Sequence, residues 1–117
     1  MDVKRSILQE IKSEDFANRG ISLFIKRDDL IDTEISGNKW RKLKYNIALC
    51  ESKMKEGILT FGGAFSNHLV ATAAACKNAN LKSIGVVRGE ELTAESNSTL
   101  KRCAELGMEL VFISREE

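Results

Sequence analysis

Three short apolar runs recur at nearly even intervals in the second half of the chain and constrain its fold more than any other feature. The runs are Ile58–Phe61, Ser83–Val87 and Leu110–Ile113, and they begin about 25 residues apart. Apolar runs of this length are typical of parallel strands that are covered on both faces. The spacing favours a repeat of strand, turn, helix and turn, so the sequence predicts a parallel sheet whose strands are connected by helices.

The segments between the runs have the spacing of amphipathic helices, with apolar residues at steps of three and four. The last helix is expected from about Ser96 to Leu106, with Gly107 placed as its C-terminal stop. The residues expected on the buried faces are Trp40, Leu43, Ile47, Cys50 and Met54 in the first helix, Leu69, Val70, Ala73 and Cys76 in the second, and Leu100, Cys103 and Ala104 in the third.

Together these elements predict an α/β fold, a three-layer αβα unit with a short parallel sheet and right-handed crossovers. The 117 residues suit a single unit. Within it, residues 1–20 are uncertain, residues 21–38 form a strand (Ile21–Arg27) and a loop, and residues 39–117 form the βα repeats. Because the sequence stops directly after the third run, we expect an exposed edge strand and one thinly covered sheet face. An oligomer could cover that edge, but we favour a piece of a longer protein.

The composition excludes several classes of protein. The 18 basic and 17 acidic side chains nearly balance and form no basic stripe of the kind that binds nucleic acid. No apolar run approaches the roughly 20 residues that span a membrane, and the N-terminus lacks the apolar stretch of a signal peptide, so we expect a cytoplasmic protein. Cys50, Cys76 and Cys103 are an odd number without a close pair, which predicts free buried thiols rather than a disulfide or a zinc site.

A lysine stands in the first turn of the first expected helix, within the segment Ser36–Leu43. Helix starts carry positive partial charge, which disfavours a nearby cation and favours the neutral amine. A neutral amine is the form that condenses with a carbonyl cofactor. From spacing alone, however, Lys39 is more simply interpreted as a solvated surface lysine, as are Lys42 and Lys44.

A glycine-rich turn, Phe61–His68, follows the first expected strand and opens the second helix. Gly62 and Gly63 allow a tight turn and a close approach of the backbone to a ligand. Ser66 is a plausible N-cap, and the free N–H groups at that helix start form an anion pocket at the carboxyl end of a strand, where open α/β sheets bind ligands. The alternative is a capped helix after a glycine turn, with no ligand. The turn is not a P-loop, because no Gly-Lys-Ser/Thr follows it.

Two further polar features have simpler structural interpretations. His68 is the single histidine, so we expect a hydrogen-bonded structural residue rather than a member of a Ser/His/Asp triad. Asp28 and Asp29 are adjacent, and adjacent residues of a strand point to opposite faces. We therefore expect them to tie down a loop, and we predict no metal site.

Three motifs occur in a characteristic order with fitting intervals: Lys26–Leu30, then Ser36–Leu43, then Gly62–His68. In this order they resemble the 1-aminocyclopropane-1-carboxylate (ACC) deaminase and D-cysteine desulfhydrase family. These are enzymes that depend on pyridoxal phosphate (PLP) and have the tryptophan-synthase-β-like fold. The resemblance covers roughly residues 20 to 117. It implies that the chain is the N-terminal segment and small domain of a longer PLP enzyme.

The resemblance also implies roles for five residues. Lys39 matches the lysine that carries PLP as a Schiff base and moves protons at the substrate α-carbon, which makes it both catalytic and cofactor-binding. Asn38 and Asn67 match cofactor neighbours, Asn67 at the phenolic oxygen. Ser66 matches a catalytic residue of the deaminases and, with Asn67 and His68, the pocket for the substrate carboxylate.

The chain also departs from the family pattern. Family members commonly carry Gln where this chain has Phe65. They are much longer, and the glycine-rich loop for the cofactor phosphate, the residue at the pyridine nitrogen and a tyrosine near the substrate match no part of this sequence.

The function predicted from the resemblance is that of a PLP-dependent lyase or deaminase that acts on a small amino acid and releases ammonia, with or without sulfide. From the exposed sheet edge we expect a homo-oligomer. One alternative is a truncated, catalytically inactive α/β domain that folds or oligomerises without a cofactor. A second is a small Rossmann-like domain that binds another anion at Gly63–His68.

Overall fold

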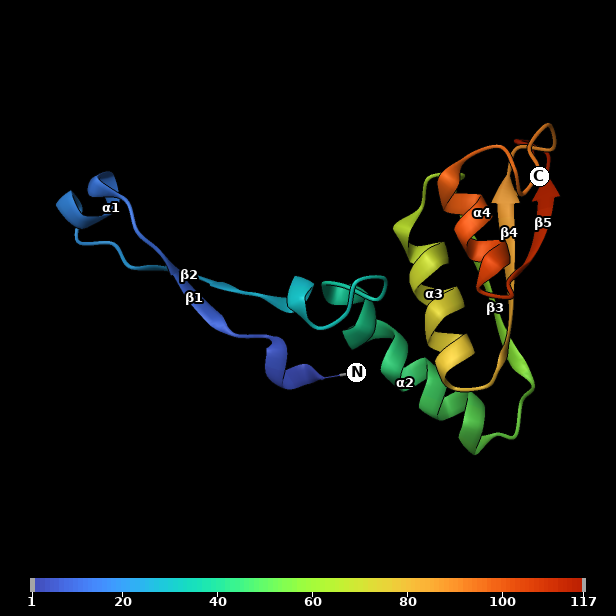
Figure 1. Cartoon of the computed structure of the whole chain (residues 1–117), viewed down its shortest axis with the longest axis horizontal. Coiled ribbons are helices and arrows are strands. Elements are labelled where there is room, and N and C mark those ends of the chain that lie inside the picture. The colour runs from blue at the N-terminus through green and yellow to red at the C-terminus, as the bar shows by residue number, and fades with distance from the viewer. Residues whose placement is uncertain (1, 117) are drawn as a thin grey trace.

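Strand–helix repeats make up the second half of the chain in the computed structural model, which describes residues 2–116 (Figure 1). The three strands pair in parallel in the order β3-β4-β5, with Leu59 of β3 opposite Ile84 of β4. The predicted α/β class with a short parallel sheet is thereby confirmed. The elements are β3 (Gly57–Gly62), α3 (Asn67–Asn78), β4 (Lys82–Arg88), α4 (Ser98–Glu105) and β5 (Glu109–Ile113).

An N-terminal arm of two antiparallel strands extends away from this unit (Figure 1). The strand expected within Ile21–Arg27 is present as β2, and it pairs with a strand that the sequence did not predict. Every residue of both strands is exposed, including Phe24 at 51%. The elements of the arm are a 3₁₀ helix (Val3–Arg5), β1 (Leu8–Ile11), α1 (Glu14–Asn18), β2 (Leu23–Lys26) and a second 3₁₀ helix (Asp28–Leu30).

Helix α2 (Asn38–Ser52) connects the arm to the sheet. Leu43, Ile47 and Cys50 are buried, as predicted from their spacing, and Trp40, predicted on the same face, is half-buried against the core. Met54 was wrongly placed on the same face: it is 91% exposed because the helix ends at Ser52 and Met54 adopts the left-handed conformation, with φ of 51°.

The two connecting helices bury the faces that the sequence indicates, with one exception. Leu69, Ala73 and Cys76 of α3 and Leu100 and Cys103 of α4 are buried, and Val70 is half-buried against the core. Ala104 was expected inward but is exposed, because one residue beyond Cys103 turns the side chain by about 100° around the helix. The predicted stop at Gly107 is confirmed by its φ of 90°. All three cysteines are free and buried, as predicted.

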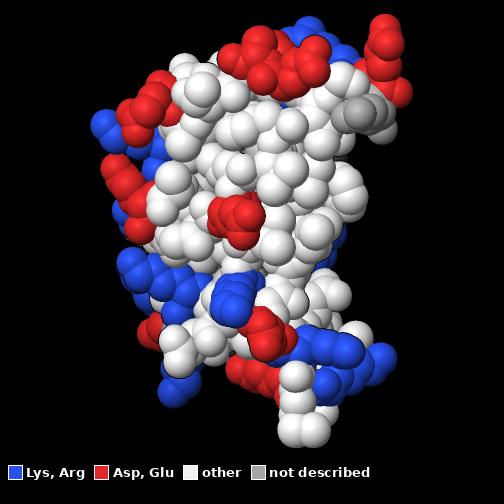
Figure 2. Space-filling view, turned by 90° about the vertical axis from the view of Figure 1, so that its right-hand side faces the viewer, with Lys and Arg blue, Asp and Glu red and all other residues white. Residues whose placement is uncertain are grey.

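Both connecting helices lie on the same side of the sheet (Figure 1). Strand residues that face α3 and α4, such as Val87, are buried, whereas on the opposite face Leu59 is 55%, Phe61 68% and Val111 39% exposed. Figure 2 views this side of the molecule, and its surface is broadly uncharged. The thinly covered face that the sequence predicts is thus observed, and among residues 2–116 no helix supplies the third layer of the expected αβα unit on it. Helices from two crossovers of the same hand, between neighbouring strands taken in order, lie on one side of a sheet.

Removal of a core side chain should measure how much stability this packing supplies. We expect Leu100→Ala to lower the free energy of unfolding by about 2–5 kcal/mol, because Leu100 is fully buried and its truncation leaves a cavity in the core. Leu49→Ala is the matched control on α2, where Leu49 is 52% exposed, and should change it by about 0.5 kcal/mol or less. Urea unfolding followed by circular dichroism compares the two, and equal losses would contradict the observed core.

Candidate functional site

The start of α2 presents Lys39 in the first helical turn, as the sequence predicts. Gly37 precedes the helix with a φ of 63°, a conformation that disfavours other residues. Its backbone N–H donates to the carbonyl oxygen of Asp28 at 3.2 Å, which fixes the entry to the helix. Lys39 is half-buried, and its Nζ donates to Oδ1 of the exposed Asn38 at 3.3 Å.

Asp28 also holds α2 through its side chain. Its carboxylate accepts hydrogen bonds from Arg41 Nε at 2.5 Å and Nη2 at 2.9 Å, and from Ser6 Oγ at 2.5 Å. These hydrogen bonds, Arg41 first and Ser6 second, lower the pKa of Asp28 well below its usual range. Asp29 pairs separately with Arg27. The expected role of Asp28 in tying down a loop therefore has a geometric basis, and the loop is the one that leads into Lys39.

The glycine-rich turn runs from the end of β3 into α3. Ser66 occupies the N-cap position with extended backbone, but its hydroxyl makes no capping hydrogen bond to the described helix. Ser66 is therefore the N-cap residue, as predicted, but its hydroxyl does not cap the helix. The hydroxyl is thus available to a ligand. A Cβ at Gly63 would meet nothing within 4 Å, so the backbone there is open to close approach, whereas a Cβ at Gly62 would lie 2.7 Å from Leu69 Cγ. Gly62 thus serves packing, and Gly63 faces open space.

His68 ties the start of α3 to the sheet. Its Nε2 lies 2.8 Å from Oγ1 of Thr60 on β3, and its carbonyl oxygen accepts a hydrogen bond from Thr72 Oγ1 at 2.8 Å. Burial lowers the pKa of His68, and the positive charges of Lys39 and Lys42 lower it further. Helices α2 and α3 also pack against each other.

The two segments that the sequence singles out therefore begin two helices, α2 and α3, that pack against each other. A hollow of about 360 Å³ lies alongside, between α2, β3 and α3. His68 lines this hollow, but Asn38, Lys39, Ser66 and Asn67 do not. In the part of the chain that the structure describes, no cluster of three or more His, Cys, Asp or Glu side chains is arranged to hold a metal ion.

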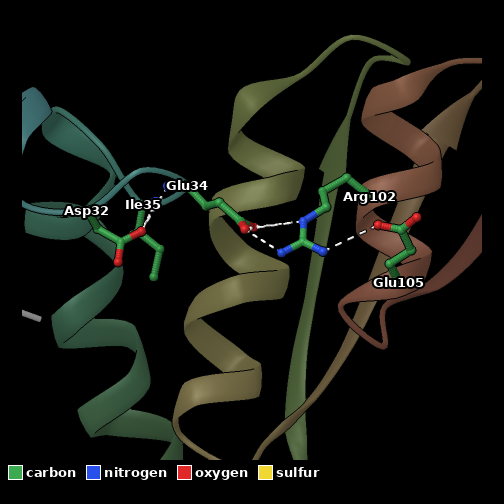
Figure 3. Close-up of polar contacts among 5 residues, drawn as sticks. All are labelled: Asp32, Glu34, Ile35, Arg102 and Glu105. Carbon is green, nitrogen blue, oxygen red and sulfur yellow. Dashed lines mark hydrogen bonds and ion pairs between the residues drawn. The ribbon is translucent and has the colours of Figure 1, made fainter.

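Contacts from α4 were missed by the sequence analysis. Asn97, the residue before α4, donates from Nδ2 to the carbonyl oxygen of Ala64 in the glycine-rich turn at 3.0 Å. Arg102 binds Glu34 in the loop before Lys39 (Figure 3). An Asn just before an apolar helical repeat is a recognisable N-cap signal. The Arg102–Glu34 pair joins residues 68 apart and carries no such signal.

None of the helices among residues 2–116 has the length and apolar character needed to cross a membrane.

No family model matches the chain. It is 41% identical over 81 residues to the mitochondrial bifunctional D-cysteine desulfhydrase/1-aminocyclopropane-1-carboxylate deaminase of Arabidopsis thaliana, a match that covers 69% of this chain and 20% of that protein. A putative 1-aminocyclopropane-1-carboxylate deaminase of Thermotoga maritima is 38% identical over 98 residues, which cover 84% of this chain and 31% of that protein.

A solved structure described as an ACC deaminase homologue aligns with a TM-score of 0.74 and 31% identity, over 93% of this chain and 32% of that one. The chain thus spans between 20% and 32% of the length of these similar proteins.

The lowered pKa of His68 leads to a prediction about pH. As the pH falls, His68 is protonated in the unfolded chain before it is protonated in the folded one. The stability contributed by the neutral ring is therefore complete above pH 6.5, the ordinary pKa, and is lost as the pH falls through the folded-state pKa. We expect the free energy of unfolding to decrease from about pH 7 to about pH 5 in the wild type and to stay flatter in His68→Asn. Urea unfolding at each pH tests this, and parallel curves would contradict it.

Proposed function

We infer that this chain carries the lysine-bearing part of a PLP site. Over most of its own length it is a relative of the 1-aminocyclopropane-1-carboxylate deaminase and D-cysteine desulfhydrase family. The observation that carries this proposal is that α2, which begins with Asn38 and Lys39, packs against α3, which begins after Ser66 with Asn67 and His68. The wider similarity in sequence and fold supports it.

The chemistry of these residues fits PLP bound to an amino acid. A half-buried primary amine at Lys39 can condense with the cofactor aldehyde. The start of α3 offers backbone N–H groups to an anion, the open space at Gly63 admits a ligand close to the backbone, and the Ser66 hydroxyl is not used as a cap. An amino acid carries a carboxylate that such a helix start suits.

PLP, when bound, supplies the electron sink that stabilises negative charge at the substrate α-carbon. The residues of this chain would do the rest. Lys39 would hold the cofactor and move a proton at that carbon. Asn38 and Asn67 would orient the cofactor, and Ser66, Asn67 and His68 would bind the substrate carboxylate, His68 by holding the turn against Thr60.

The reaction proposed for the whole protein is the release of ammonia, with or without sulfide, from a small amino acid. In this proposal residues 1–117 form the N-terminal segment and small domain of a longer enzyme. A cytoplasmic location stays a prediction of the sequence.

A second candidate is favoured by the uncovered sheet face and by the exposed edge strands. Such surfaces associate readily when nothing covers them. The chain would then be a catalytically inactive α/β domain that folds and forms homo-oligomers through the sheet edge without a cofactor. The open face, with Leu59, Phe61 and Val111, supports this proposal.

Labelling of the purified chain separates the two candidates. After incubation with PLP and reduction with borohydride, we expect a visible absorption band before reduction and a covalent label on Lys39 afterwards, identified by peptide mass spectrometry. Lys39→Ala should lose the label, whereas Lys42→Ala and Lys44→Ala, which remove neighbouring lysines of α2, should keep it. A label that persists in Lys39→Ala, or no label in the wild type, contradicts the PLP proposal for this chain.

Sedimentation measures the association. We expect the wild type to self-associate as its concentration rises, and Val111→Lys to weaken this, because a charge on an edge strand opposes pairing. Leu49→Lys, which adds the same charge on the exposed side of α2, is the control. A wild type that stays monomeric at high concentration contradicts the proposed oligomer.

A further inference from the structure

We propose that helix α4 positions the two halves of the site relative to each other. Asn97 would hold the glycine-rich turn, and Arg102 would hold the loop that leads into Lys39. Neither is proposed to touch substrate or cofactor, so both are positioning residues. The functional role of these two residues rests on the PLP function proposed for Lys39. The contacts of Asn97 and Arg102 are observed independently of that function.

Asn97 uses both ends of its side-chain amide. Its Oδ1 accepts a hydrogen bond from the backbone N–H of Leu100 at 2.8 Å and so caps α4. Its Nδ2 donates to the carbonyl oxygen of Ala64 at 3.0 Å, two residues before Ser66. Because the first contact needs an acceptor and the second a donor, the amide is held in one orientation. The turn before α3 is therefore attached to the beginning of α4.

Arg102 makes the corresponding contact with the other loop (Figure 3). Its Nη2 lies 2.5 Å from Glu34 Oε1, and its Nε lies 3.2 and 3.3 Å from the two carboxylate oxygens. Nη1 binds Glu105 at 3.3 Å, which orients the guanidinium from the opposite side. The Glu34 side chain is only 26% exposed, so the pair is partly shielded from water.

The loop that carries Glu34 is itself well defined. The carboxylate of Asp32 accepts hydrogen bonds from the backbone N–H groups of Glu34 at 2.8 Å and Ile35 at 3.0 Å, which shapes the turn shown in Figure 3. Ile35 is fully buried in the core. The chain from this turn to Asn38, where α2 begins, is short, so a displacement of Glu34 would be passed to Lys39.

Helix α4 is therefore in contact with both loops of the site. Leu100 and Cys103 anchor it in the core, so it offers a fixed reference for each loop. Partly exposed ion pairs contribute little to global stability. The Arg102–Glu34 pair is thus better suited to setting the local position of a loop than to holding the fold.

Hydrogen–deuterium exchange and Lys39 labelling together test the proposal in the full chain. In Arg102→Leu we expect faster exchange at residues 34–39. We also expect the rate of Lys39 labelling with PLP and borohydride to fall about tenfold, which is less than the ~100-fold loss of rate that a 1 Å misplacement can cause in an enzyme. Asn97→Asp keeps the capping acceptor and loses the donor, so faster exchange is expected at residues 63–68 while α4 stays protected.

The controls separate position from charge and from folding. Glu34→Arg combined with Arg102→Glu restores the pair and should recover both the exchange and the labelling rate. Lys101→Leu removes a neighbouring charge of α4, whose contact with Glu95 is a loose 3.9 Å, and should change neither. If Arg102→Leu does not fold, Arg102→Lys, which keeps the charge without the two-pronged contact, takes its place.

The outcomes are distinct. Exchange and labelling that match those of Lys101→Leu overturn the positioning role, as does faster exchange with unchanged labelling. A wild type that is not labelled at Lys39 rejects the PLP proposal instead. The exchange at residues 34–39 and 63–68 then decides alone whether α4 holds the two loops.

Discussion

The close packing of α3 on the parallel sheet is the contact on which the rest of the structure depends. Leu69 occupies the space that side chains at Gly62 and Gly85 would need. A Cβ at Gly62 would lie 2.7 Å from Leu69 Cγ, and a Cβ at Gly85 would lie 3.3 Å from Leu69 Cδ2. Because those side chains are absent, the helix lies close to the strands and its alanine-rich face is buried. Protein interiors tolerate little shift once packed, so the first turn of α3, with Ser66 and Asn67, is held at the end of β3.

Polar contacts then place the second half of the site against this core. Asp28 holds the beginning of α2 through Arg41, and Glu34 holds the preceding loop to α4 through Arg102. These pairs are partly exposed, so their main effect is on geometry rather than on the stability of the fold. The opposite sheet face and the N-terminal arm leave large apolar side chains exposed, such as Phe61 and Phe24. The same chain thus combines a candidate site held by polar contacts with surfaces suited to association.

The sequence predicted the repeats but not all of their surroundings. The three apolar runs are found as β3, β4 and β5, because their periodicity depends only on local pattern. Met54 was misplaced because helix ends depend on which residue takes up the left-handed conformation. The strand β1 could not be foreseen, because its segment Leu8–Ile11 has no alternation and pairs only through β2. For the candidate site, the segments around Lys39 and Ser66 were identified by motif, but their proximity was not visible in the sequence.

By itself, the sequence determined the α/β class, the order of strands and helices from α2 onward, the buried thiols and the two segments that the candidate site contains. These follow from residue periodicity, glycine placement and local motifs, which act over a few neighbouring residues. Only the tertiary structure decided that the Ser66 hydroxyl does not cap α3, that Asn97 contacts the glycine-rich turn, and that Arg102 contacts the loop before Lys39. Each of these depends on which distant segments meet in space, and Glu34 and Arg102 lie next to Ile35 and Cys103, which belong to the same core.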